Sequence, residues 1–346
     1  MIHVGIIGYG YWGPNLVRNF YETPGATVSC VSDLRAERLK QVQARYPTIR
    51  VTQDHRDLID DPAVDLVVIA TPVSTHFELA LSAIKAGKHV LVEKPLASTS
   101  AQVQRLRDEA DKAGVLLLVD HTFVYTGAVR KMRQLVQGGE LGEIYYYDSA
   151  RVNLGLFQHD VNVIWDLAVH DLSIMDHVLP EHPVAVSATG VSHVPGEPEN
   201  VSFLTLFFDS PLIAHVHVNW LAPVKVRRTL LGASRKMVVY DDLEQSEKIK
   251  IYDRGITLDR RADPEQIYQV LVGYRTGDML APTLDTSEAL KVEAAHILRC
   301  IDGKEKPLAG GDAGFRVVEI LEAASESMKN RGRPVELASA RTTRGV

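Results

Sequence analysis

The glycine spacing near the N-terminus constrains the fold of this chain more than any other feature. The run GYGYWG occupies residues 8–13, directly after an apolar stretch from Ile2 to Ile7 and before a helical pattern. In such a run the first glycine makes the strand-to-helix turn, the second lets the backbone approach a pyrophosphate, and the third lets helix and strand pack closely. Free N–H groups and the helix dipole then favour the phosphates. The spacing predicts a dinucleotide-binding βαβ unit, with a purely structural glycine turn as the alternative.

An acidic residue at the end of the next apolar run bears on the choice of cofactor. Asp33 lies 20 residues after Gly13 and follows the run over 26–32. A carboxylate at this place accepts hydrogen bonds from the adenosine ribose and repels a 2′-phosphate, so NAD is predicted in preference to NADP. Arg35 and Arg38 lie nearby and could weaken that preference. Asp33 also fits the N-cap of the helix that follows.

The composition is that of an ordinary globular protein with room for two domains. The chain has 346 residues, of which 45% are hydrophobic and 24% are charged, and its net charge is −6. It has no long basic block, so neither nucleic acid nor a membrane surface is expected as a partner. Two cysteines suggest neither a disulfide framework nor a zinc site, and no targeting or membrane-spanning segment is recognisable, so a cytoplasmic location is expected.

Short apolar runs alternate with helical patterns in the first third of the chain. Strands are expected over 2–7, 26–32, 49–51, 66–69, 89–92 and 115–119, and helices over 14–22, 35–45, 75–86 and 99–113. Apolar strands separated by helices predict a doubly wound parallel sheet of the Rossmann type, which is assigned to residues 1–122.

The remainder of the chain has longer stretches of alternating polarity. A helix is expected near 126–137, followed by strands over 143–151, 184–191, 201–208, 213–220, 226–231 and 236–239. The alternation predicts an α+β domain over 123–335 with a large, mostly antiparallel, open-faced sheet, and then a polar tail over 336–346. Val216, Val218 and Trp220 would face the core, with His215 and His217 on the other face. That face suits a homodimer or homotetramer, and the two histidines lack a third metal ligand, so no metal site is predicted.

Two short motifs follow predicted parallel strands. Thr71-Pro72 comes after the strand at 66–69, and Glu93-Lys94-Pro95 comes after the strand at 89–92. Ligands bind at the carboxyl ends of strands in such sheets, although either proline could simply end a strand. His76 lies just beyond Thr71-Pro72 and is a candidate for the cofactor side, with an ordinary histidine near a helix N-terminus as the alternative.

Asp166 and His170 form a third motif, four residues apart. On an α-helix this spacing places both side chains on one face, where the carboxylate can orient the imidazole as a general base. The alternative is an N-cap aspartate followed by a core histidine.

The ordered set of GYGYWG, Thr71-Pro72, EKP and DxxxH resembles the Gfo/Idh/MocA oxidoreductase family, from Ile2 to about Met328. The resemblance implies an NAD(P)-dependent enzyme that acts on sugars, inositols or their derivatives. It assigns the active site to Lys94, Asp166 and His170, and it implies a cis peptide bond before Pro95. The predicted cofactor-binding residues are Gly8, Gly10, Tyr11, Trp12, Gly13, Asp33, Thr71, Pro72, His76, Glu93 and Lys94.

Three further stretches look like a subgroup that oxidises nucleotide-activated amino sugars. These are residues 11–16, 165–173 and 224–228, which are similar to UDP-N-acetylglucosamine 3-dehydrogenases and imply oxidation at C3. Val169 departs from the proline expected there and keeps an N–H that proline lacks. Lys225, Arg227 and Arg228 could bind a diphosphate, or be solvated or ion-paired. The alternatives are a free-sugar or inositol dehydrogenase, a keto-sugar reductase, an NAD-dependent glycoside hydrolase and a non-catalytic NAD-binding regulator.

The expected chemistry is transfer of hydride from a ring carbon to the nicotinamide while the hydroxyl proton leaves. His170 is the expected general base, Asp166 would orient it, and Lys94 would stabilise the alkoxide. Lys94 could instead be the acid/base, with His170 as the orienting donor. The predicted substrate-binding residues are His121, Tyr125, Asn153, Gln158, Trp165, Asp166 and His170.

Overall fold

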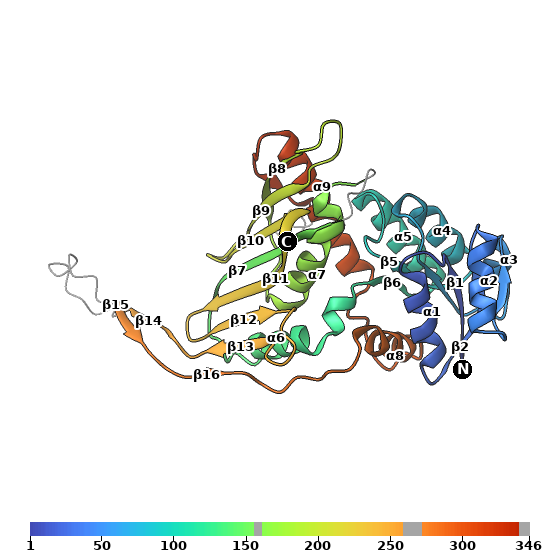
Figure 1. Ribbon diagram of the computed structural model, residues 1–346, viewed down its shortest axis with the longest axis horizontal. Helices are drawn as coiled ribbons and strands as arrows, with labels where there is room; N and C mark the ends of the chain where they lie inside the picture. Colours follow the sequence, from blue (N-terminus) through green and yellow to red (C-terminus); the bar gives the residue numbers. More distant parts are fainter. Residues whose placement is uncertain (156–160, 259–271, 339–346) are drawn as a thin grey trace. The chain divides into compact units, whose positions relative to one another are not determined.

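The computed structural model describes residues 1–155, 161–258 and 272–338 (Figure 1). The chain forms two compact units. Unit 1 consists of Met1–Thr126 with Thr286–Glu322, and unit 2 of Gly127–Asp285 with Ala323–Val346. Each unit contains its own sheet.

Unit 1 contains a parallel sheet of six strands in the order β3-β2-β1-β4-β5-β6. The strands are β1 (Ile2–Ile7), β2 (Ala26–Ser32), β3 (Arg50–Thr52), β4 (Leu66–Ile69), β5 (His89–Glu93) and β6 (Leu117–Asp120). The helices between them are α1 (Gly13–Glu22), α2 (Ala36–Arg45), α3 (Arg56–Ile59), α4 (Val73–Lys85) and α5 (Ser100–Ala113). The strand order reverses where β1 has β2 on one side and β4 on the other, which is where doubly wound sheets bind nucleotides. The predicted Rossmann-type sheet is confirmed.

A helix from late in the sequence completes the core of unit 1. Helix α8 (Ala289–Ile301) contributes Leu290, Ala294 and Ile297 to the cluster that also contains Leu16 and Phe20. The structure thus divides the chain differently from the predicted domains 1–122 and 123–335. The contacts that place 286–322 in unit 1 join residues far apart in the sequence, so local periodicity contains no signal of them.

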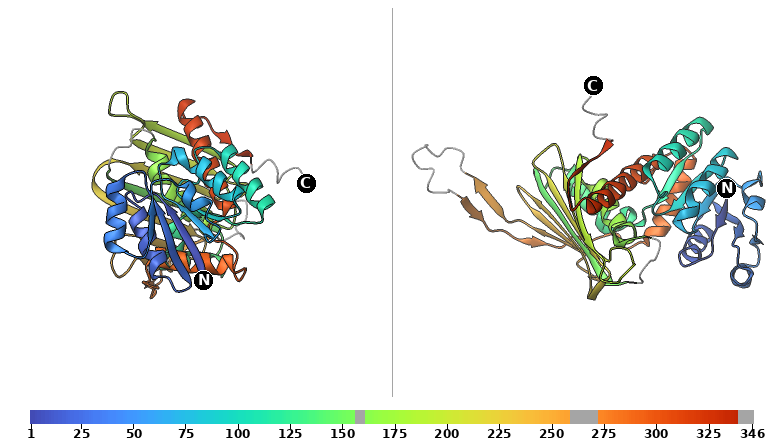
Figure 2. Two further views of the ribbon diagram at one scale, coloured as in Figure 1. Left: turned by 90° about the vertical axis from the view of Figure 1, so that its right-hand side faces the viewer. Right: turned by 90° about the horizontal axis from the view of Figure 1, so that it is seen from above.

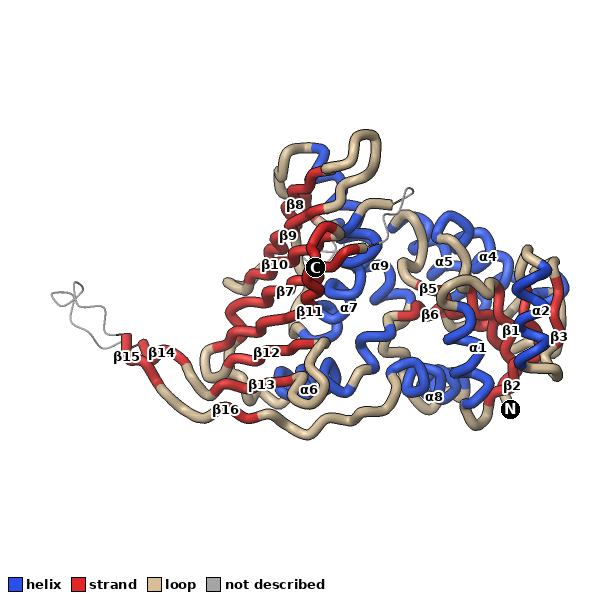
Figure 3. The backbone as a smooth tube through the Cα atoms, in the orientation of Figure 1, coloured by secondary structure: helices blue, strands red, loops and turns tan. Residues whose placement is uncertain are grey.

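Unit 2 is built around a sheet of nine strands in the order β16-β13-β12-β11-β7-β10-β9-β8-β17 (Figure 3). The strands are β7 (Ile144–Leu154), β8 (Ala185–Val191), β9 (Val201–Phe207), β10 (Ile213–Asn219), β11 (Leu221–Ala233), β12 (Met237–Asp241), β13 (Ile249–Tyr252), β16 (Met279–Leu280) and β17 (Val335–Glu336). All neighbours are antiparallel except β7 and β10. The predicted, mostly antiparallel sheet is confirmed. Strands β14 (Gly255–Leu258) and β15 (Val272–Arg275) pair separately.

Helices of unit 2 pack against one face of this sheet only (Figure 2). They are α6 (Gly127–Gln137), the turn η2 (Ile164–Ala168), α7 (Val169–Val178) and the end of α9 (Gly311–Lys329), whereas the short helix η1 (Thr122–Tyr125) belongs to unit 1. Val216, Val218 and Trp220 are fully buried, whereas the His215 and His217 rings stack on Phe203 at the other face. The predicted assignment of faces is therefore confirmed.

The start of the predicted polar tail belongs to the sheet. Glu336, the first residue assigned to the tail, lies in β17 and pairs with Ala185, and Leu337 is 2% exposed. A two-residue strand with one apolar anchor produces no recognisable alternation, which is why the sequence pattern missed it. The rest of the predicted tail, from 339, lies outside the described residues.

Candidate active site

The GYGYWG loop of unit 1 has the shape of a cradle for a dinucleotide. Gly8 has φ +99°, and a Cβ there would lie 2.4 Å from the carbonyl oxygen of Ala70. A Cβ on Gly13 would lie 2.2 Å from the carbonyl oxygen of Gly8. Helix α1 begins at Gly13, and its N-cap residue Trp12 makes no side-chain cap hydrogen bond. Pro14 has no N–H and the Asn15 N–H donates to the Trp12 carbonyl at 2.9 Å, so in the first turn the Gly13 N–H and the helix dipole remain to bind a pyrophosphate, and these residues fit the predicted cofactor.

Asp33 is held in its ionised form beside this loop. Its carboxylate accepts hydrogen bonds from the backbone N–H groups of Tyr9 (2.8 Å) and Arg35 (2.9 Å), and Arg38 Nη1 lies 3.3 Å away. Burial raises the pKa of Asp33, but these donors outweigh burial and hold the pKa below its ordinary value. The carboxylate can still accept from a ribose hydroxyl, because an ionised carboxylate offers about four lone-pair sites.

The two proline motifs are linked beneath the surface by His76. Its Nδ1 lies 2.9 Å from the carbonyl oxygen of Pro95 and its Nε2 lies 2.8 Å from that of Thr71. The ring is fully buried, and burial lowers the pKa of His76, so the ring is neutral. A neutral imidazole has a single N–H, which donates to one of the two carbonyl oxygens. His76 was predicted on the cofactor side, but the structure places it as a link between the loops that carry Thr71 and Lys94. The Lys94-Pro95 peptide bond is cis, which confirms the expectation from the resemblance.

The carboxyl ends of β5 and β6 bring together acidic residues. Glu93 and Asp120 are sheet partners, and Trp12 Nε1 donates to Asp120 Oδ2 at 2.7 Å. Asp120 was not among the predicted site residues, although its position as the last residue of a parallel strand could have identified it. The candidates that follow it are core residues. His121 is 3% exposed, and Tyr125 is 2% exposed with its ring 5.5 Å from that of His296. Both side chains are buried, and their contact with a substrate stays a prediction.

In unit 2 the DxxxH motif crosses a junction between two kinds of helix. Asp166 lies in η2, a π-helical turn, and His170 lies in α7. The Val169 N–H donates to the carbonyl of Ile164, the five-residue bond of a π turn, which a proline at 169 could not make. The expected α-helical geometry is therefore wrong at Asp166, because the π turn changes the spacing of side chains around the axis.

Trp220 supports Asp166 from the sheet. Its indole Nε1 donates to Asp166 Oδ2 at 3.0 Å, and its side chain is fully buried. Sequence analysis placed Trp220 only in the core, since nothing local connects it to residue 166. Trp165, a predicted substrate residue, uses its own Nε1 to donate to Ser325 Oγ at 3.0 Å. Asn153 lies half-buried near the end of β7, and Gln158 lies outside the described residues.

A buried ion pair anchors the helix that carries His170. Arg151 Nε on β7 lies 2.6 Å from Asp171 Oδ2, and both side chains are 3% exposed. Ser149 Oγ donates to Asp171 Oδ1 at 2.6 Å, and Tyr147 Oη donates to the Asp171 carbonyl at 3.1 Å. These bonds hold the first turn of α7 against the sheet, so the backbone of His170 is fixed by its neighbour.

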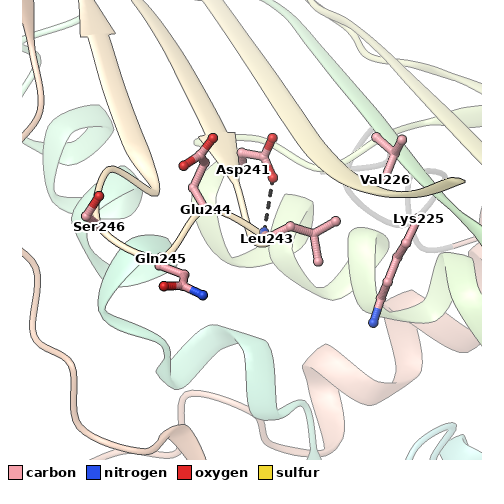
Figure 4. Close-up of a pocket in the computed structure, with 7 residues that line it drawn as sticks. All are labelled: Lys225, Val226, Asp241, Leu243, Glu244, Gln245 and Ser246. Atoms are coloured by element: carbon pink, nitrogen blue, oxygen red, sulfur yellow. Dashed lines mark hydrogen bonds between the residues drawn. The ribbon is translucent and has the colours of Figure 1, made fainter.

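An open cavity of about 390 Å³ lies elsewhere in unit 2 (Figure 4). It is lined by Lys225, Val226, Asp241, Leu243, Glu244, Gln245 and Ser246. Arg227, one of the residues considered for a diphosphate, instead places Nη1 3.2 Å from Asp242 Oδ2. None of the predicted catalytic residues lines this cavity.

No group of three or more His, Cys, Asp and Glu side chains is arranged to hold a metal ion within 1–155, 161–258 and 272–338. In the same ranges no helix is long and apolar enough to cross a membrane.

Comparison with known proteins supplies the family. A model described as "Oxidoreductase family, NAD-binding Rossmann fold" matches residues 2–121, and one described as "GFO/IDH/MocA C-terminal domain" matches residues 129–238. The chain belongs to the Gfo/Idh/MocA family. It is a dehydrogenase that acts on CH–OH groups, with an NAD-binding Rossmann domain, and the family includes users of both NAD and NADP.

Two relatives that this Gfo/Idh/MocA protein matches over nearly their whole length are named for inositols. It is 29% identical to the myo-inositol 2-dehydrogenase of Thermotoga maritima, covering 97% of this chain and 98% of the relative. It is 26% identical to the NADP(+) scyllo-inositol 2-dehydrogenase of Bacillus subtilis, covering 95% and 94%. A solved oxidoreductase-family structure from Magnetospirillum magnetotacticum MS-1 has 27% identity and a TM-score of 0.78, covering 93% of this chain and 99% of that one.

Proposed function

We propose that this protein oxidises a secondary ring hydroxyl of an inositol or a free sugar with NAD⁺. The observation that carries the proposal is the match over nearly the whole chain to an enzyme named myo-inositol 2-dehydrogenase. The structure adds no support for the nucleotide sugar expected from sequence. Arg227 forms an ion pair with Asp242. The cavity that Lys225 lines also contains Asp241 and Glu244, whose negative charges would repel a diphosphate.

The proposed mechanism divides the chemistry among three side chains. Bound NAD⁺ supplies the hydride acceptor. His170 takes the hydroxyl proton, because an imidazole has its ordinary pKa near neutrality. Asp166, held by the Trp220 indole, orients and stabilises the charged ring. Lys94 donates a hydrogen bond to the oxygen as it becomes an alkoxide.

NAD is proposed over NADP because of Asp33. The donors around its carboxylate keep it ionised, and a negative charge there repels a 2′-phosphate while still accepting from a ribose hydroxyl. Arg38 is the nearest cation, and its ion pair with Asp33 leaves it less available to a phosphate.

The first test is a substrate panel followed by NADH absorbance. Purified protein is mixed with NAD⁺ or NADP⁺ and with inositols, free sugars or UDP-N-acetylglucosamine, in the presence of a carbonyl trap, because alcohol oxidation by NAD⁺ is unfavourable near neutral pH. We expect reduction of NAD⁺ with an inositol or a free sugar, and a smaller rate with NADP⁺. The Lys94→Ala variant serves as the blank.

Other outcomes of the panel would contradict the proposal in distinct ways. A signal with UDP-N-acetylglucosamine alone would restore the nucleotide-sugar hypothesis. If no substrate gives a signal but NAD stays bound through purification, a glycoside hydrolase or a keto-sugar reductase becomes the better account. Adding NADH and a keto-inositol then distinguishes these two, since only the reductase consumes NADH.

We also propose that the uncovered face of the unit 2 sheet joins two copies of the chain. Large apolar side chains on neighbouring strands remain exposed there: Tyr146, Phe203, Phe207 and Ile213. Such a contiguous patch is unusual on a monomer. Light scattering is expected to give the mass of a dimer or tetramer, and Phe203→Glu should shift it towards one chain, whereas Leu34→Glu in unit 1, where Leu34 is 81% exposed, should not. A monomeric parent protein would contradict this proposal.

A further inference from the structure

Glu293 is a buried carboxyl group to which neither the cofactor cradle nor the proposed mechanism gives a role. It lies on α8 in unit 1 and is 2% exposed. Neither of its carboxyl oxygens has a donor within hydrogen-bonding distance among the described residues. A buried carboxylate without donors is strongly disfavoured, so Glu293 is present as the neutral acid. A neutral acid has one O–H to donate and therefore needs an acceptor.

The neighbouring carboxylate of Asp120 on β6 can accept that hydrogen. It is 2% exposed and already accepts from Trp12 Nε1 at 2.7 Å and from Thr122 Oγ1. These two donors already bond the Asp120 carboxyl group, whereas Glu293 has no such donors among the described residues. Two neighbouring buried carboxyl groups cannot both ionise, so they share one proton, which resides on Glu293.

The surroundings of Glu293 reinforce its neutral state. Burial is the main cause that raises the pKa of Glu293 well above its ordinary value, and the nearby carboxylates of Asp120 on β6 and Glu93 on β5 raise it further. The phenol of Tyr125 on η1 is also within electrostatic range and is itself kept neutral by burial. One turn along α8, His296 Nδ1 lies 2.7 Å from Glu305, which engages that imidazole instead.

Trp12 connects this acid pair to the cofactor loop. It is the N-cap residue of α1 and part of GYGYWG, and its carbonyl accepts from the N–H groups of Asn15 and Leu16, so its position sets where α1 begins. Its indole ring is held by the hydrogen bond that Nε1 donates to Asp120. We infer that Glu293 is a positioning residue for dinucleotide binding: its proton orients the Asp120 carboxylate, which in turn fixes Trp12 at the start of α1.

The first experiment detects the proton directly. Infrared difference spectra between the parent protein and Glu293→Gln at neutral pH should show the C=O stretching band of one protonated carboxylic acid, present only in the parent. This readout does not depend on NAD or on any substrate, so it succeeds or fails independently of the proposed function. If no such band is present, Glu293 is ionised and the inference is overturned.

The second experiment compares two replacements of equal length. Glu293→Gln keeps a neutral donor for Asp120, whereas Glu293→Met fills the same space without one. The Kd for NAD⁺, measured by calorimetry, should stay within about twofold in the Gln variant and rise about three- to tenfold in the Met variant, as for the net loss of one typical hydrogen bond. If Glu293 only fills space, methionine will serve at least as well as glutamine, and the inference fails. Thermal unfolding confirms that both variants are folded.

A double-mutant cycle shows whether the effect passes through Trp12. Trp12→Phe keeps an aromatic ring but removes the indole N–H that Asp120 accepts. In this background the difference in Kd between the Gln and Met variants at 293 should disappear, because Asp120 no longer has the indole N–H to accept. An unchanged difference would exclude Trp12 as the link.

In the parent protein the affinity for NAD⁺ should also fall as rising pH ionises Glu293. The Glu293→Gln variant should lack that part of the pH dependence.

Discussion

Replacing Lys94 with alanine is expected to lower kcat about 10²- to 10³-fold while the Kd for NAD⁺ changes less than about threefold, as found when an oxyanion donor is removed. His170→Ala should have a similar effect, since positioned general bases contribute about 10²- to 10⁴-fold. The measurement is steady-state kinetics on the substrate identified by the panel, with calorimetry for NAD⁺. Lys85→Ala, in the last turn of α4, is the matched control and should leave kcat unchanged.

The pH dependence of kcat distinguishes the two possible roles of this pair. If His170 is the base, the decrease of kcat at acid pH follows its titration and disappears in His170→Ala. If Lys94 is the acid/base and His170 only orients the substrate, the decrease persists in His170→Ala and disappears in Lys94→Ala. Full activity of either variant would show that the motif residues are not the catalytic groups.

Replacing Asp171 with asparagine is expected to lower the free energy of unfolding by about 3–5 kcal/mol, the usual cost of breaking a buried ion pair. The change removes the Asp171 charge from the Arg151 guanidinium, which is 3% exposed, and it weakens the bond from Ser149. Chemical denaturation monitored by circular dichroism provides the measurement. As a control, Glu22→Gln removes an exposed pair with Arg18 at 3.9 Å, which should change stability by less than about 1 kcal/mol.

A compensating pair tests the physical reason for that loss. Replacing Arg151 by methionine together with Asp171 by leucine removes both charges, so much of the stability should return, because the penalty comes from the uncompensated guanidinium. If the double variant is as unstable as the single one, the loss comes from packing. Activity should remain low even when stability returns, since the first turn of α7, which positions His170, loses its bonds to β7.

The sequence by itself determined the parts of this protein that depend on local pattern. GYGYWG, the apolar runs and Asp33 were sufficient to predict the parallel sheet and the cofactor cradle, because turn geometry and strand burial are set by residues close together in the chain. Alternation likewise predicted the antiparallel sheet and which face of β10 is buried. The motifs Thr71-Pro72 and EKP could be placed correctly at strand ends for the same reason.

Only the tertiary structure decided how distant residues support these motifs. Trp220 donates to Asp166 across 54 residues, and α8 brings Glu293 beside Asp120 and completes the core of unit 1. The burial of His76 and Tyr125, which the sequence placed beside ligands, was likewise visible only in the folded chain. Periodicity reports which face of an element is apolar but not which element will cover it. The hydrogen bonds and buried charges that join residues far apart in the sequence therefore cannot be predicted from its local pattern.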